Sequence, residues 1–484
     1  MLRGEVKHTG GEESKIIWAV LLNHHDWSDD LLYTKVFDAT LLEVQHWQKE
    51  VESSVGKDWS EWLDAAIINS SGSAAYKLIK KKTEKQGGVS KTGEIEIQQK
   101  IWHDIWNRDL KKRPQLLKDI DYIRQLHSND ETFTRERWDQ VISQLRKGAG
   151  KGVDQVDRDF LDKCSEGSRN ELYQIAKEIV REQVWPVQNL VALIAMQPKP
   201  GSEGMRPIAL LTMIYRLLTK AIRTPVAQWD ELHAESWDWN IKGRGAEAAS
   251  FHESMEAELI QMSGDYIASG LLDMTKFYDN VSIDWLIKTA QHLRFPRTAL
   301  ILGVEVMMSW RMLQIGHEVR EIGVVGNGIV PGDPFATSFA RCYLYPALLA
   351  AQSMAMKLKL DMRLRVFVDD VRCRVAAKTQ TEAAQGAANV LNRFLNCLQD
   401  RQCEINKGKT ILMGTTAQVR RELDRRLKNA GWDLQTKKQA KDLGTDSALG
   451  GKRRVAVQTS RAKRARTEHW RLLRWSRQTG KPQS

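Results

Sequence analysis

The sequence predicts an α+β fold, in which helices are interspersed with short antiparallel strands. Apolar residues recur at helical intervals over the first part of the chain. Further along, apolar runs of strand length are bounded by turns rich in glycine and proline. The clearest of these is residues 364–375 (LRVFVDDVRCRV), which predict two short strands joined at the acidic pair Asp369-Asp370.

Residues 1–92 are predicted to form a helical N-terminal extension, and residues 93–146 a second helical segment. In both, tryptophan and leucine recur at helical intervals, which is typical of side chains that face a core. In the second segment Trp102 and Trp106 share one face. Residues 80–93, rich in Lys, Gly, Ser and Thr, predict a linker between the two.

A basic turn is predicted to follow the strand at Asn189–Ala195, where Lys199 and Arg206 project between prolines and glycines. Because Arg binds phosphate through two hydrogen bonds and Lys as a point charge, the turn is a candidate phosphate clamp. An ordinary solvated hairpin fits the same residues. Two glycine-rich loops come later, at Lys242–Ala249 and Gly326–Phe335, and their small residues allow a backbone or a base to approach closely.

A strand predicted at Tyr266–Leu272 runs directly into Asp273. A strand that ends on one carboxylate, beside a hairpin that carries Asp369 and Asp370, makes a three-carboxylate site for Mg²⁺. Two such ions about 3.5–4 Å apart stabilise the attacking and leaving oxygens in phosphoryl transfer. The adjacent pair alone fits a solvated hairpin turn equally well, and it is the upstream Asp273 that favours nucleotidyl transfer.

The net charge of +12 is concentrated at the C-terminal end. Residues 451–484 contain eleven Lys and Arg and one acid, Glu468, which leaves about +2 for the rest of the chain. Such a tail is typical of nucleic-acid contact or of a nuclear-import signal. A solvated tail is a third interpretation, whereas Trp470 and Trp475 among the arginines favour an amphipathic helix.

The five cysteines form no CxxC pair and have no nearby histidine pair, so they predict neither a zinc site nor a disulfide framework. No signal peptide is apparent, and the longest apolar runs are far too short to span a bilayer. We therefore expect an intracellular protein without membrane contact, with the nucleus as one destination because of the basic tail.

Taken in order, these motifs resemble the reverse transcriptase (RNA-directed DNA polymerase) family, most closely its non-LTR retrotransposon and group II intron branch. The resemblance covers roughly Lys147 to Arg454, about two thirds of the chain. Its motifs, in chain order, are Lys199 with Arg206-Pro207-Ile208, Gly243-Arg244-Gly245, Asp273, Gly332-Asp333-Pro334, Phe367-Val368-Asp369-Asp370, Asn406 with Lys409-Thr410, and Lys441-Asp442-Leu443-Gly444. Seven motifs in the family's order argue against a chance match.

The resemblance implies a right-hand polymerase, with fingers and palm over residues 147–454 and either a basic tail or the start of a truncated thumb over residues 455–484. It implies that Asp273 and Asp369 hold both metal ions. The second acid of the pair, Asp370, is implied to be a less direct ligand.

Several further roles follow from the resemblance. Lys199 and Arg206 match the residues that grip the incoming triphosphate. Gly332 matches the loop that lies against template and nucleotide. Lys409 matches the lysine proposed to protonate the leaving pyrophosphate, and Leu443-Gly444 matches the primer-grip motif.

Tyr278 lies five residues after Asp273, where reverse transcriptases place a Phe or Tyr that blocks a ribose 2′-OH. The resemblance therefore implies selection of deoxynucleotides. The sequence departs from the family at Pro331, where the second palm motif normally carries Gln, and at Phe367, where the acidic motif normally carries Tyr. Neither change removes a metal ligand.

The implied activity is RNA-directed DNA polymerisation, in which the 3′-OH of a DNA primer attacks a dNTP on an RNA template. Two Mg²⁺ ions are the implied cofactors, with Mn²⁺ as a substitute. The alternative is a polymerase-fold protein that binds RNA without synthesis, as maturase-like splicing factors do, or a decayed copy of a retrotransposon-like element. None of these patterns predicts the oligomeric state.

Overall fold

The computed structural model describes residues 93–126, 133–148, 150–199, 204–443 and 445–449, together with Thr459, Ser460, Lys463 and Arg466. The predicted N-terminal extension, its linker and most of the basic tail lie outside these residues. The described chain divides into two compact units. The first runs to Thr224 and includes Arg297–Phe335; the second contains Pro225–Pro296 and the residues from Ala336 onward.

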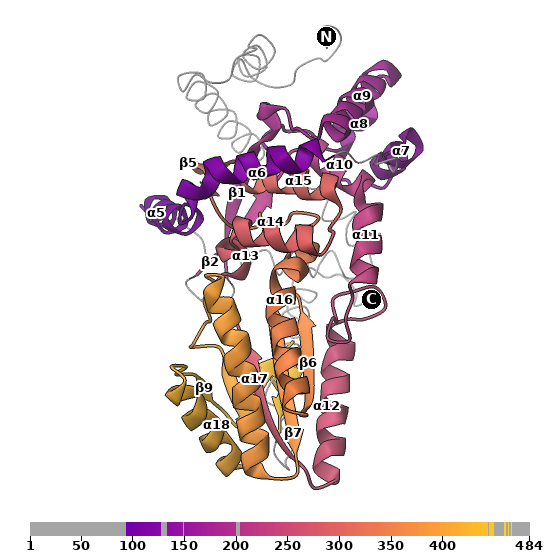
Figure 1. The fold of residues 1–484 in the computed structure, drawn as a ribbon. Coiled ribbons are helices and arrows are strands. Elements are labelled where there is room, and N and C mark those ends of the chain that lie inside the picture. Colours follow the sequence, from indigo (N-terminus) through magenta and orange to yellow (C-terminus); the bar gives the residue numbers. More distant parts are fainter. Residues whose placement is uncertain are drawn as a thin grey trace, which may run out of the picture. The chain divides into compact units, whose positions relative to one another are not determined.

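The first unit combines a four-stranded sheet with helices (Figure 1). The strands are β1 (Val191–Pro198), β2 (Met205–Leu210), β4 (Trp310–Ile315) and β5 (Glu318–Val324). Their order is β2-β1-β4-β5, with β1 and β4 parallel and both outer pairs antiparallel. The helices are α5 (Glu94–Trp106), α6 (Arg113–Gln125), α7 (Arg135–Ser143), α8 (Arg158–Lys163), α9 (Glu166–Glu182), α10 (Met213–Ala221) and α15 (Arg297–Met307), with short 3-10 turns at η1 (Leu110–Lys112) and η2 (Val187–Asn189).

Helices α5, α6 and α7 lie within residues 93–146, where the apolar periodicity predicts helix. In α5 the rings of Trp102 and Trp106 are buried, with centroids 4.9 Å apart. Helix α9 begins at Glu166, because the side chain of Ser165 accepts the backbone N–H of Ser168 and caps it.

The second unit contains a five-stranded sheet and a separate two-stranded hairpin. The sheet strands are β3 (Tyr266–Leu272), β6 (Asp361–Phe367), β7 (Asp370–Ala377), β8 (Ile411–Gly414) and β9 (Gln435–Thr436), and the hairpin strands are β10 (Gln439–Asp442) and β11 (Thr445–Ala448). The helices are α12 (Ala246–Met262), α13 (Phe277–Asn280), α14 (Ile283–His292), α16 (Ala336–Lys357), α17 (Gln380–Asp400) and α18 (Ala417–Asn429); α11 (Arg223–Leu232) begins in the first unit and ends in the second.

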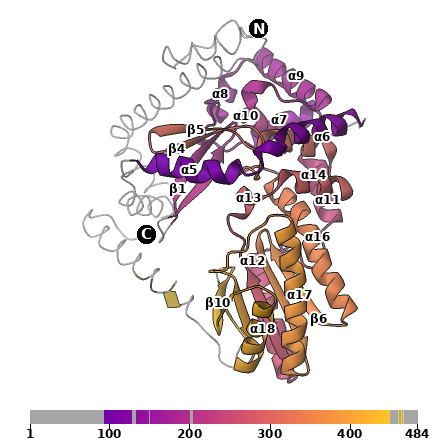
Figure 2. The same ribbon diagram turned by 60° about the vertical axis from the view of Figure 1, so that its left-hand side comes forward.

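The five-stranded sheet is covered differently on its two faces. Its strand order is β6-β7-β3-β8-β9, and all pairs except β8-β9 are antiparallel. A Cβ on Gly270 would lie 2.9 Å from Leu391, so β3 packs closely against α17 on one face. On the other face Ile267 packs with Ala257 of α12 and with Ala440 of the hairpin, because alternate residues of a strand face opposite sides. Figure 2 shows α16 and α17 side by side against this sheet.

Both units therefore mix helices with sheets that are mostly antiparallel, which confirms the predicted α+β class. None of the helices that the structure describes combines the length and the apolar character needed to cross a bilayer.

Candidate active site

Asp273 stands at the end of β3, where the loop before β8 fixes its backbone. Its N–H donates to Oγ1 of Thr410 at 3.1 Å, and its carbonyl accepts the N–H of Asn406 at 2.8 Å. Because β3 and β8 are antiparallel neighbours, the start of β8 lies beside the end of β3. The carboxylate of Asp273 is thus held at the rim of the sheet.

The acidic pair lies on the hairpin between β6 and β7, as the sequence predicts. Phe367 and Asp370 form the last strand pair, so the turn consists of Val368 and Asp369 while Asp370 opens β7. Val368 has φ of 61°, and a positive φ at the first turn position is a feature of type II′ hairpins. For a β-branched residue this conformation is strained, at a cost of about 1–2 kcal/mol.

The three carboxylates act on one another electrostatically. Burial, together with the charge of Asp273, raises the pKa of Asp369 above its ordinary value. Partial desolvation, and then the charges of Asp369, Asp442 and Asp273, raise the pKa of Asp370 to about 6. Like charges that raise each other's pKa mark a place where a cation is stabilised.

Lys409 and Tyr278 flank this group. Nζ of Lys409 lies 3.8 Å from Oδ2 of Asp273. Tyr278 lies on the short helix α13, and burial and the charge of Asp369 raise the pKa of its phenol, which therefore stays neutral. The structure thus brings five predicted residues together in the second unit: Asp273, Asp369, Asp370, Lys409 and Tyr278.

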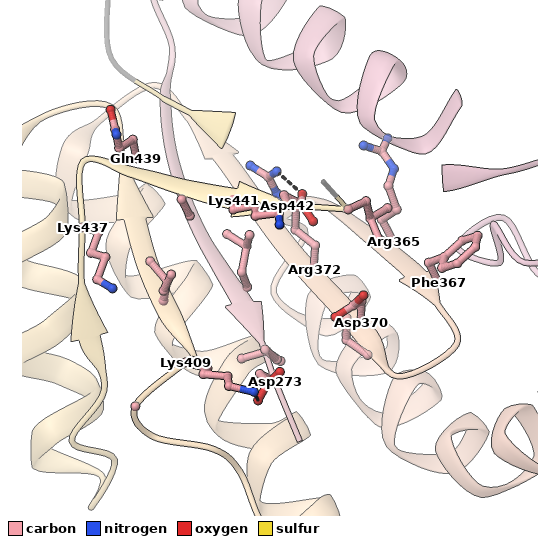
Figure 3. Close-up of a pocket in the computed structure, with 17 residues that line it drawn as sticks. Asp273, Arg365, Phe367, Asp370, Arg372, Lys409, Lys437, Gln439, Lys441 and Asp442 are labelled. Carbon is pink, nitrogen blue, oxygen red and sulfur yellow. Dashed lines mark hydrogen bonds and ion pairs between the residues drawn. The ribbon is translucent and has the colours of Figure 1, made fainter. Parts of the chain in front are cut away.

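A cavity of about 520 Å³ opens beside the carboxylates (Figure 3). Asp273 and Asp370 line it together with Lys409, and Lys437 and Lys441 add two further cations. Such a mixed lining suits a ligand that carries phosphates next to a bound cation.

The sequence interpretation gave no role to two residues of this cavity. Arg372 of β7 donates from Nη1 to Oδ2 of Asp442 at 2.7 Å, and Asp442 lies on β10 (Figure 3). The available signal was the alternation of Arg365, Arg372 and Arg374 with apolar residues, which predicts a charged face on two otherwise apolar strands.

The carboxylates suit a divalent ion by their chemistry. Across the residues described, no three Asp, Glu, His or Cys side chains gather closely enough to form a metal cage, so the predicted three-carboxylate site is not formed by the protein alone. Mg²⁺ does not require one, because it binds through one or two carboxylates and takes its other ligands from water and substrate phosphates. Asp273 and Asp369 carry hard oxygen atoms that could hold such an ion, because burial and the neighbouring charge favour a cation beside them.

The residues predicted to grip the triphosphate, and the predicted Gly332 loop, lie in the first unit. Arg206 is on β2 opposite Gln197, and the N–H of Lys199 donates to the carbonyl of Gly204 at 2.8 Å, which closes the hairpin turn. Gly332 has φ of 96° and a Cβ there would lie 3.6 Å from the carbonyl of Ala209 on β2.

The glycine-rich loop is therefore packed against the basic hairpin. Ala209 donates its N–H to the carbonyl of Pro331 at 3.0 Å. Asp333 anchors the loop from inside: its Oδ1 accepts the N–H of Phe335 at 2.6 Å, and the hydroxyl of Tyr215 donates to Oδ2. The structure thus gathers Lys199, Arg206 and the Gly332 loop on one sheet edge.

Comparison with known proteins identifies the fold. The family model described as reverse transcriptase (RNA-dependent DNA polymerase) matches residues 197–445, just over half of the chain, and that span contains every site residue discussed above. No curated protein gives a significant match. With both groups of residues inside the matched span, the chain belongs to the reverse transcriptase family.

Proposed function

We propose that this protein is an RNA-directed DNA polymerase that extends a DNA primer with dNTPs on an RNA template. The observation that carries the proposal is the meeting of Asp273, Asp369 and Lys409 at one end of the five-stranded sheet, with Tyr278 beside Asp369. These residues come from separate elements; the carboxylates and the lysine suit nucleotidyl transfer, and the tyrosine ring suits selection of the sugar.

Each side chain has a defined task. Asp273 and Asp369 would hold Mg²⁺ (or Mn²⁺), and Asp370 contributes a further negative charge at the cavity. The bound ions supply stabilisation of charge on the attacking and leaving oxygens. Lys409 donates a proton towards the leaving pyrophosphate, and the ring of Tyr278 occupies the space that a ribose 2′-OH needs.

The first unit supplies the nucleotide grip in this proposal. Lys199 and Arg206 bind the triphosphate, and Gly332 lets the loop approach template and nucleotide. The basic hairpin of the first unit then belongs to the fingers, and the carboxylates of the second unit belong to the palm of a right-hand polymerase. A retrotransposon-like element of the non-LTR or group II intron branch is the proposed source, with RNA template and DNA primer as partners.

Primer extension tests the proposal directly. Purified full-length protein is incubated with poly(rA)·oligo(dT), dTTP and Mg²⁺, and in parallel with Mn²⁺. The matched control is Asp273→Asn, which keeps the size of the side chain and removes its charge. Extension by the wild type and not by this variant supports polymerase activity. Binding of RNA without extension in either metal supports the maturase-like alternative instead.

A further inference from the structure

Arg372 joins four elements of the second unit. It lies on β7, two residues after Asp370, and its side chain is 5% exposed. Nε lies 3.2 Å from Oε1 of Glu253 on α12 and 3.4 Å from the hydroxyl of Ser269 on β3. Nη1 donates to Asp442 of β10 at 2.7 Å and to the hydroxyl of Ser447 of β11 at 2.8 Å.

These contacts tie the β10–β11 hairpin to the strand that begins with the acidic pair. Residues 370 and 372 of β7 face the same side of the sheet, because strand residues alternate. The same hairpin contributes Lys441 and Leu443 to the cavity wall. A shift of the hairpin relative to β7 therefore changes the cavity beside the catalytic carboxylates.

The hairpin has little apolar anchorage among the described residues. Ala440 and Leu449 pack into a small cluster with Ala257, Ile267 and Met413. The Arg372 side chain connects the hairpin to β7 through contacts that are buried and charged. Removal of one partner from a buried ion pair leaves the other charge without compensation, which is strongly destabilising.

Asp442 places this connection at the cavity. Its side chain is 15% exposed and lines the same cavity as Asp273 and Asp370. Arg372 donates to Oδ2 of Asp442, so the contact that holds the hairpin lies at the cavity wall.

We propose that Arg372 is a positioning residue of the polymerase. It holds the β10–β11 hairpin in place beside the catalytic hairpin, so that the primer terminus is presented correctly. This inference rests on the proposed polymerase function.

Arg374 provides a matched control on the same strand. Its side chain is 2% exposed and pairs with Glu253 at 3.6 Å and Glu256 at 2.5 Å, both on α12. Arg374→Gln therefore removes the same charge from the same face of β7, and the ion pairs that it breaks run to α12 and not to the hairpin. A loss of exchange protection or of extension seen in Arg372→Gln but not in Arg374→Gln therefore comes from the hairpin connection.

The first measurement does not depend on catalysis. Hydrogen exchange of the 439–448 segment is followed in the full-length wild type, Arg372→Gln and Arg374→Gln. We expect exchange in this segment to accelerate at least about tenfold in Arg372→Gln, the size of a typical coupling between contacting residues, and to change little in Arg374→Gln. Equal protection in all three proteins, or equal loss in both variants, overturns the proposal.

The second measurement distinguishes a role of Arg372 in placing the primer from a purely structural role. In steady-state extension, Arg372→Gln should raise the KM for primer–template by about tenfold with little change in the KM for dNTP, and Arg372→Lys should recover part of the loss. An unchanged primer KM, or no recovery in Arg372→Lys, overturns it.

Two further outcomes, a variant that does not fold and a wild type that extends no primer, are also covered. Should Arg372→Gln fail to fold, Asp442→Asn weakens the same connection from its more exposed side and must loosen the 439–448 segment. Should the wild type extend no primer at all, the polymerase proposal fails, and the exchange data still decide whether Arg372 holds the hairpin.

Discussion

Lys409 and Asp273 face each other across the ends of two neighbouring strands, with 3.8 Å between Nζ and Oδ2. Their side chains are 66% and 33% exposed, and an ion pair in such surroundings contributes little to folding stability. The ion pair therefore shows where Lys409 is placed, and the stability of the fold does not depend on it. Substitutions at Lys409 report on chemistry because they leave the fold in place.

Lys409→Ala should lower kcat of primer extension by about 10²- to 10³-fold, the range expected for loss of a general acid. Affinity for a primer–template duplex should change little, because a single cation is removed. Lys407→Ala is the matched control, since Lys407 is exposed in the same loop. Filter binding and single-turnover extension measure the two quantities, and a normal kcat in Lys409→Ala would contradict the assigned role.

Asp273→Asn and Asp369→Asn should each reduce extension by on the order of 10³-fold, because several kcal/mol of charge stabilisation is lost and each 1.36 kcal/mol is tenfold in rate. The thermal midpoint should stay the same or rise slightly, since the charge of Asp273 raises the pKa of Asp369 and its removal relieves repulsion. Asp284→Asn on α14, whose partner is Lys288, is the control. Near-wild-type extension by either active-site variant removes that residue from the mechanism.

Tyr278→Ala should increase the use of ribonucleotides relative to deoxynucleotides by on the order of tenfold, because truncation opens the space for a 2′-OH. Tyr278→Phe keeps the ring and should leave the ratio unchanged. Incorporation of rTTP and dTTP in parallel reactions gives both ratios. A ratio that does not move in Tyr278→Ala shows that another group selects the sugar.

Asp154 gives a pH dependence of stability in the first unit. Burial raises its pKa to about 6 from an ordinary value of 3.8. Protonated Asp154 therefore favours the folded state, and its contribution is fully present below about pH 4 and is lost as the pH rises through about 6. Asp154→Asn keeps an oxygen to accept the N–H of Met213 and does not titrate.

The free energy of unfolding of the wild type, taken relative to Asp154→Asn, should accordingly fall by up to about 3 kcal/mol between pH 4 and pH 7. Urea unfolding followed by tryptophan fluorescence at several pH values measures it. Parallel stability curves for the two proteins would show that Asp154 titrates normally in the folded state.

Deletion of residues 451–484 should weaken duplex binding and make its salt dependence shallower. Each phosphate neutralised contributes about −0.9 to the slope of log K against log salt for B-form duplex. If half of the eleven basic residues reach phosphates, the slope becomes shallower by about 5. A nuclear-import role predicts an unchanged slope and a loss of nuclear accumulation, so the two measurements distinguish the interpretations.

The sequence predicted those strands whose pattern of apolar and charged residues lies within one short segment. The strand expected at Tyr266–Leu272 coincides with β3, because an apolar run is ended by a charged residue. Both strands around the acidic pair are present as well. By contrast, β4 and β5 were not predicted, since β4 pairs with β1 across more than a hundred residues and three of the seven residues of β5 are charged.

The site residues differ in the same way, according to whether their signal is local or long-range. Asp273, Asp369 and Lys409 could be predicted because each stands in a short motif whose order resembles a family. The ion pair between Arg372 and Asp442 could not be predicted, because it joins residues seventy positions apart. No local pattern indicates that an arginine in a buried strand will meet an aspartate from a later hairpin.

Val368 places backbone strain next to Asp369. Its φ of 61° is costly for a valine and persists only where the surrounding structure imposes it. Glycine would relieve that strain in a single mutational step. The hairpin that carries the acidic pair is therefore held in its conformation by its surroundings and not by the preference of its own turn residue.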